Sequence, residues 1–154
     1  MLDRIDKVIL GLLQRDAALS VAEIASQVSL SSTPCWRRIQ RLEEQGYISK
    51  RVALLCPEKL NLGVTVFVAV KTSQHSEAWF EQFRHVVSAI PEVVEFYRMS
   101  GEVDYLLRIV VPDIKRYDWV YKQLIKGTGL FDVSSSFAME QLKLTTELPL
   151  DYAD

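Results

Sequence analysis

Two different spacings of apolar residues divide the chain. Up to about residue 46, apolar side chains recur every three or four positions, the spacing of amphipathic helices. This spacing predicts helices over about 3–15, 21–28 and 32–45. Ser20 and Glu23 form a capping-box pattern before the second helix, Ser31 or Ser32 caps the third, and Gly46 ends it. We therefore expect three short helices that share one apolar core.

After residue 63 the spacing changes to strands that alternate with helices. Strands are predicted over 64–71, 93–99, 105–111 and 133–140, and helices over about 77–88 and 114–126. The order β-α-β-β-α-β is typical of a ferredoxin-like fold, with a four-stranded antiparallel sheet and both helices on one face. The first strand carries valines on one side and Phe67 and Ala69 on the other. Because both sides are apolar, we expect a second copy to cover the open face.

The predicted fold class is therefore α+β, with a (winged) helix-turn-helix domain followed by a ferredoxin-like βαββαβ regulatory domain. The expected boundaries are 1–51 for the first domain, 52–63 for a linker that includes a short strand from Val52 to Leu55, and 64–154 for the second domain.

The third helix has one apolar side and one basic side. At roughly 100° per residue, Cys35, Ile39 and Leu42 share the apolar side, which makes Cys35 a buried structural thiol rather than a redox switch. The opposite side carries Thr33, Trp36, Arg37, Gln40 and Arg41, with Arg38 flanking. Two helices joined by a short turn, the second with exposed arginines, indicate a helix-turn-helix that binds DNA.

Charge is concentrated near this helix although the whole chain has a net charge of −2. Residues 1–51 hold eight Lys/Arg and six Asp/Glu, whereas residues 52–154 hold ten and fourteen. A charge run alone is more simply a solvated helix face; the cap, the turn and the sidedness together favour DNA binding. We expect Ser32, Thr33, Arg37 and Arg41 near base edges and Arg38, Lys50 and Arg51 on phosphates, while Trp36 either touches the DNA backbone or covers the helix junction.

Other classes of function have little support in the sequence. His75 and His85 are isolated, no phosphate-binding loop or metal motif occurs, and Cys35 and Cys56 are too few for a zinc site, so we expect neither an enzyme nor a cofactor, nor a metal-sensing repressor. The apolar run 64–70 is too short to span a membrane, and the charged N-terminus is unlike a signal peptide, which predicts a cytoplasmic protein. A binding module whose first segment packs without contacting DNA stays open as an alternative.

Four stretches of the sequence resemble the leucine-responsive regulator (Lrp/AsnC) family over essentially the whole chain. They are LDRIDKVILGLLQRDAALS, LSSTPCWRRIQRLEEQGYI, MSGEVDYLLRIVVPD and SSSFAMEQLKLTTELPL. The second is similar to the family's recognition helix, and the last two are similar to its amino-acid-binding domain. VALLCPEKLNLGVTVFVAVKT and the final segment resemble the branch that includes a cysteine-responsive detoxification regulator. The resemblance implies a sequence-specific transcription regulator of amino-acid metabolism.

The resemblance also implies a homodimer that assembles further to an octamer and holds an amino-acid effector between dimers, with cysteine as the first candidate. The implied effector residues are Met99, Ser100, Gly101, Asp104 and Tyr105, with Ser134, Ser135 or Ser136 supplied by a neighbouring chain. An amino acid is a zwitterion, so the Asp104 carboxylate suits its ammonium group and the Gly101 amide suits its carboxylate. The simpler alternative makes Gly101 a turn glycine and Asp104 a surface or intersubunit carboxylate.

Overall fold

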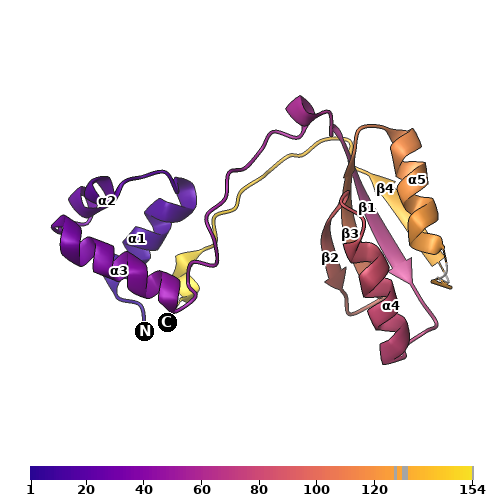
Figure 1. The fold of residues 1–154 in the computed structure, drawn as a ribbon, viewed down its shortest axis with the longest axis horizontal. Coiled ribbons are helices and arrows are strands. Elements are labelled where there is room, and N and C mark those ends of the chain that lie inside the picture. The colour runs from indigo at the N-terminus through magenta and orange to yellow at the C-terminus, as the bar shows by residue number, and fades with distance from the viewer. Residues whose placement is uncertain (127, 130–131, 154) are drawn as a thin grey trace. The chain divides into compact units, whose positions relative to one another are not determined.

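The computed structural model describes residues 1–126, 128–129 and 132–153, which form two compact units (Figure 1). Unit 1 consists of Met1–Leu54 together with Leu142–Asp154, and unit 2 consists of Leu55–Gln141. Each unit has a separate cluster of buried apolar side chains. None of the described helices is both long enough and apolar enough to cross a bilayer.

Unit 1 contains the three predicted helices: α1 (Arg4–Arg15), α2 (Val21–Gln27) and α3 (Ser32–Glu44). Both α1 and α2 begin with a capping box, in which the side chains of Asp3 and Ser20 accept backbone N–H groups three residues later. Gly46 follows α3 with a φ of 77°, a conformation that favours glycine after a helix. The apolar stripes of the three helices meet in one core that includes Ile9, Ile24, Ile39 and Leu42.

The C-terminal segment belongs to unit 1, which corrects the prediction that residues 64–154 form one domain. The Gln14 side chain donates to the Leu148 carbonyl at 3.1 Å and accepts the Leu148 N–H at 2.9 Å. Lys7 Nζ donates to the Ala153 carbonyl at 2.5 Å, and Leu150 packs against the unit 1 core. These contacts explain why a segment that follows the sheet in sequence groups with α1.

The predicted strand from Val52 to Leu55 is absent, which is a second correction. These described residues have no strand partner, and the side chains of Val52, Leu54 and Leu55 are 62%, 69% and 69% exposed. The apolar run predicted a strand, but a strand also needs a hydrogen-bonded neighbour, and no segment of this chain pairs with it in the described structure. A one-turn 3-10 helix, η1 (Glu58–Leu60), follows.

Unit 2 has the predicted β-α-β-β-α-β order. Its elements are β1 (Val64–Lys71), α4 (Glu77–Ser88), β2 (Val93–Arg98), β3 (Tyr105–Val111), α5 (Ile114–Ile125) and β4 (Asp132–Phe137). The strands pair antiparallel in the order β2-β3-β1-β4 (Figure 1). Alternate residues of β1 and β3 are fully buried beneath α4 and α5, and Phe83 of α4 lies at the centre of this core. The ferredoxin-like prediction is therefore confirmed.

None of the described helices covers the other face of the sheet. Phe67 of β1 lies between Arg108 of β3 and Ser136 of β4 in the strand register, and its side chain is 40% exposed. Arg108 forms an ion pair with Glu95 of β2 at 2.7 Å on the same face. The face therefore combines exposed apolar surface with an internally neutralised charge pair.

Candidate nucleic-acid interface and effector site

Helix α3 packs its apolar side into the core of unit 1. Cys35, Ile39 and Leu42 are 0%, 3% and 0% exposed and face the helical core, as the spacing predicted. Ser29 adopts the left-handed conformation with a φ of 55°, which allows the short turn between α2 and α3, and Ser31 is the N-cap of α3. Because the buried side is occupied by the core, the opposite side of α3 faces solvent.

Several residues predicted to contact DNA lie on this exposed side or just beyond α3. The exposed set comprises Ser32, Thr33, Trp36, Arg37, Arg41, Lys50 and Arg51, whereas Arg38 is half-buried. Trp36 is 51% exposed, so about half of its side-chain surface is open to solvent. Arg37 forms no ion pair or hydrogen bond with any of the described side chains, which leaves its guanidinium available for an external anion or base.

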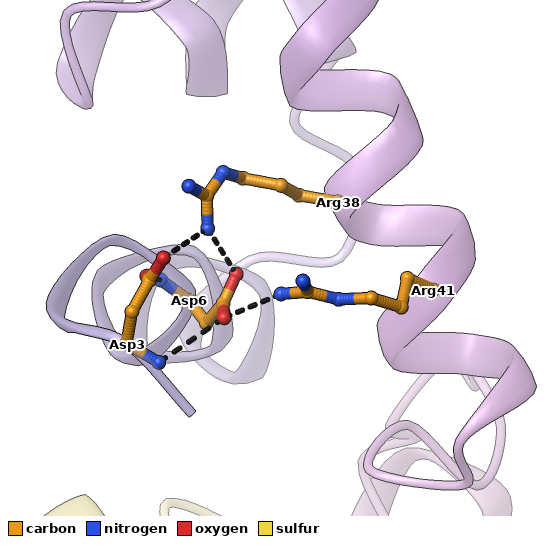
Figure 2. A network of polar contacts seen from close by, with 4 residues as sticks. All are labelled: Asp3, Asp6, Arg38 and Arg41. Carbon is orange, nitrogen blue, oxygen red and sulfur yellow. Dashed lines mark hydrogen bonds and ion pairs between the residues drawn. The ribbon is translucent and has the colours of Figure 1, made fainter. Parts of the chain in front are cut away.

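Arg38 and Arg41, which are also predicted to contact DNA, form ion pairs inside unit 1 (Figure 2). Arg38 Nη1 donates to Asp3 Oδ2 at 2.5 Å and to Asp6 Oδ1 at 2.8 Å, and Arg41 Nη2 donates to Asp6 Oδ2 at 2.5 Å. Arg51 is paired with Glu43 at 2.7 Å. Of the predicted arginines, three therefore have an acidic partner within the unit.

The electrostatics of this network follow from its hydrogen bonds. The backbone N–H of Asp6 and then the Arg38 guanidinium hold the pKa of Asp3 below its ordinary value. Hydrogen bonds to Asp3 and Asp6 raise the pKa of Arg38. Burial raises the pKa of the Cys35 thiol, with a small opposing effect of Arg38, so Cys35 is a protonated core residue.

Sequence reasoning missed Asp3 and Asp6 as partners of the recognition helix. Their three-residue spacing at a helix start is itself a capping-box signal, and Asp6 is only 1% exposed. A buried carboxylate needs a cationic or hydrogen-bonding partner, but the sequence does not show which of the arginines supplies it.

The loop between β2 and β3, predicted to hold the effector, is a closed turn at one end of the sheet. The backbone N–H of Met99 donates to the Asp104 carbonyl at 2.8 Å, and the Asp104 N–H donates to the Val70 carbonyl at 2.9 Å. Gly101 has a φ of 121°, which other residues rarely adopt. The loop backbone is therefore fixed within one chain, and Ser100 and Gly101 are exposed at its tip.

The Asp104 carboxylate is half-buried and partly engaged. Its Oδ2 accepts the backbone N–H of Thr72 at 2.8 Å, a contact that joins the β2–β3 loop to the end of β1 and that sequence reasoning did not find. The other oxygen has no hydrogen-bond partner among the described residues and can accept a further hydrogen bond. Asp104 thus uses one carboxylate oxygen to fix the loop and has the second oxygen available as a hydrogen-bond acceptor.

The remaining predicted effector residues are divided between the two faces of the sheet. Tyr105 is buried on the helix-covered face, where it contacts the rings of Phe80, Phe83 and Phe96. Ser135 lies on that face too, and its hydroxyl is hydrogen-bonded to that of Tyr117. Ser134 and Ser136 occupy alternate positions in β4 and are exposed on the open face. The structure therefore does not bring the three serines together.

A small cavity of about 250 Å³ lies beside this loop on the helix-covered face. Its lining residues are Gln74, His75, Ser76, Glu77, Phe80, Arg98 and Tyr105. No cluster of three or more His, Cys, Asp or Glu that suits a metal ion occurs in the described part of the chain.

Comparisons with known proteins also divide the chain into two parts, and the second match runs past unit 2 into the C-terminal segment of unit 1. A family model described as a winged helix-turn-helix DNA-binding domain matches residues 2–49, and a model of the Lrp/AsnC ligand-binding domain matches residues 65–148. The DNA-binding transcriptional activator DecR of Escherichia coli K12 is 53% identical over 152 residues, covering 98% of this chain and 100% of DecR. The described residues of unit 1 contain no strand, so the wing of the winged helix-turn-helix family is not observed as a strand here.

Two solved structures extend the comparison. An AsnC family transcriptional regulator from Agrobacterium tumefaciens is 61% identical with a TM-score of 0.95, over 99% of both chains. A transcriptional regulator from Neisseria meningitidis, solved as a complex with L-Met, is 36% identical with a TM-score of 0.93, over 98% of both chains.

The fold and the exposed recognition helix, together with these matches, define a DNA-binding transcription regulator with a separate amino-acid ligand-binding domain. Its first unit supplies the helix-turn-helix and its second unit supplies the ferredoxin-like ligand-binding sheet. The chain belongs to the Lrp/AsnC family.

Proposed function

We propose that the exposed side of α3 enters the major groove of an operator and that Arg37 contacts a base edge there. The observation that carries this proposal is that Arg37 is exposed next to the exposed Trp36 and has no acidic partner among the described residues. A free guanidinium at the start of a recognition helix suits a bidentate contact with guanine. Thr33 is placed for the same surface, whereas the exposed Lys50 suits a phosphate.

For the regulatory unit, we propose that a free amino acid, cysteine first, binds at the β2–β3 loop and changes the protein's affinity for DNA. The spare acceptor of Asp104 suits the ligand's ammonium group, and the exposed Gly101 backbone suits its carboxylate. The Neisseria relative was solved with L-Met, which supports an amino acid as the ligand class. We propose that the protein acts on DNA in the cytoplasm.

We further propose that copies of the chain assemble through the open face of the sheet into a dimer, and that dimers assemble to an octamer. Phe67, Leu106 and Val110 place apolar side chains on this face, and Arg108 and Glu95 neutralise each other there. An apolar, internally neutral face suits a self-complementary contact. Ser134 and Ser136 lie on the same face, where a neighbouring copy can reach them.

The effector proposal predicts the behaviour of an Asp104→Asn variant. The amide oxygen of Asn can still accept the Thr72 N–H, so the loop is retained, but the negative charge that binds an ammonium group is lost. We expect the affinity for cysteine to fall about 10- to 100-fold, the usual range for removing one charge-assisted hydrogen bond. Isothermal titration calorimetry measures this affinity, and DNA binding by fluorescence anisotropy with and without cysteine measures the response.

Glu102→Gln is the matched control, because it removes the same charge from an exposed position of the same loop. It should bind cysteine like the unmodified protein. If neither protein binds cysteine, the titration is repeated with methionine, glutamate and leucine. Equal affinity of the Asp104→Asn variant and the unmodified protein for whichever amino acid binds would show that Asp104 is not the ammonium partner.

A further inference from the structure

We propose that Asp6 is a positioning residue that withholds Arg38 and Arg41 from DNA, so that Arg37 is the arginine of α3 that reads the operator. This inference rests on one contact: the buried Asp6 carboxylate of α1 faces Arg38 and Arg41, which are three residues apart on α3 (Figure 2). The inference rests on the proposed function, in which the exposed side of α3 contacts DNA.

Both oxygens of the Asp6 carboxylate are in use. Oδ1 accepts from Arg38 Nη1 at 2.8 Å, and Oδ2 accepts from Arg41 Nη2 at 2.5 Å and from the Asp3 N–H at 3.2 Å. Asp3 adds a second carboxylate to Arg38 at 2.5 Å. Two of the three arginines of α3 therefore carry their counter-charge within the protein.

Phosphates do not readily displace these pairs. Asp6 is only 1% exposed, and if both guanidinium groups left it, an uncompensated charge would stay buried at the α1–α3 contact, which strongly destabilises a fold. The capping box and the positive end of α1 also hold the carboxylate in place. Arg37 has no such partner among the described side chains and can bind DNA without breaking a contact.

Two consequences follow for DNA recognition. Neutralising Arg38 and Arg41 lowers the attraction to any phosphate backbone, which is independent of sequence, and so increases the contrast between operator and other DNA. The two pairs also fix the rotation of α3 about its own axis, because they join two positions of α3 to one carboxylate of α1. Asp6 therefore acts on specificity through the arginines and does not touch DNA.

The test is the salt dependence of binding to a mixed-sequence DNA duplex. In Asp6→Asn the side chain keeps one acceptor oxygen but loses its charge and presents an NH₂ group to one guanidinium. With Arg41 released and Arg38 still paired with Asp3, the slope of log affinity against log salt concentration should steepen by about 0.9 for each DNA-bound copy, the value for one new phosphate contact. Affinity for the mixed-sequence duplex should rise several-fold at low salt.

Two arginine variants make the test independent of whether Asp6→Asn folds. Arg41→Gln removes a guanidinium that is already neutralised, and Asp6 keeps Arg38 as a partner, so the salt slope should be unchanged. Arg37→Gln removes a free guanidinium, so binding to DNA should weaken. Far-UV circular dichroism and thermal unfolding confirm that each variant is folded.

The outcomes separate this inference from the proposed function. If Arg37→Gln weakens DNA binding and Arg41→Gln leaves the slope unchanged, the inference is supported, and a steeper slope for a folded Asp6→Asn strengthens it. A slope for Arg41→Gln that is shallower by about 0.9 would overturn it, because Arg41 would then be a phosphate contact. An unchanged slope in a folded Asp6→Asn would overturn it as well. If Arg37→Gln binds DNA normally, the proposed function fails.

Discussion

Replacing Arg37 by alanine should weaken binding to a specific operator by about 10- to 100-fold for each α3 in contact with DNA. A well-placed bidentate contact between arginine and guanine contributes about 1–3 kcal/mol of discrimination, and about 1.4 kcal/mol corresponds to a factor of ten. Arg37 is exposed and has no ion pair with the described residues, so the substitution removes a DNA contact without disturbing the unit 1 core. Fluorescence anisotropy with a duplex selected from a random library by the unmodified protein measures the loss.

The loss should be larger on the selected duplex than on a mixed-sequence duplex, since a base contact carries sequence information and a phosphate contact does not. Arg84→Ala is the matched control: it removes the same charge from an exposed position on α4 of unit 2. It should bind both duplexes normally. Equal losses on the two duplexes would assign Arg37 to a phosphate, and no loss on either would remove it from the interface.

Replacing Phe83 by alanine should lower the free energy of unfolding of unit 2 by about 3–5 kcal/mol. Phe83 is fully buried, and its ring stacks on Trp79 at 5.1 Å and meets Phe96 edge-on at 5.5 Å and Tyr105 at 5.3 Å between centroids. No nearby side chain replaces the lost volume without repacking the aromatic cluster. Because whole domains are stable by only about 5–15 kcal/mol, this is a large fraction of the total.

Urea unfolding followed by the fluorescence of the tryptophans measures this change, at one fixed protein concentration because assembly contributes to stability. Arg84, the exposed residue that follows Phe83 on α4, again provides the control. Arg84→Ala should change the free energy of unfolding by no more than about 0.5 kcal/mol. A change below about 1 kcal/mol for Phe83→Ala would mean that the aromatic cluster is not the centre of the unit 2 core.

The fold could be predicted from the sequence because its elements depend on local patterns. The alternating valines of β1, the capping box at Ser20 and the apolar stripe of α4 each specify an element without reference to the rest of the chain. The failures involve long-range partners. The apolar run from Val52 to Leu55 resembles a strand, but none of the described segments pairs with it. Residues 142–154 have no periodicity that would indicate their contacts with α1.

The candidate site was predictable to the same extent and for the same reason. Helical spacing placed Arg37 on the exposed side of α3 and Cys35 on the buried side. It could not show that Asp6 pairs with Arg38 and Arg41, because that contact joins residues more than 30 positions apart. Nor could it separate Ser135, which faces α5, from the exposed Ser134, since that depends on the register of β4.

Hydroxyl-radical footprinting of the full chain tests most directly whether α3 lies on DNA. Trp36 on α3 is 51% exposed, and Trp119 on α5 is 43% exposed, so both indoles are open to oxidation in the free chain. On the selected duplex, mass spectrometry should show oxidation of Trp36 slowed several-fold while oxidation of Trp119 is unchanged. Unchanged oxidation of Trp36 under saturating DNA would contradict the assignment of α3 as the DNA-reading helix.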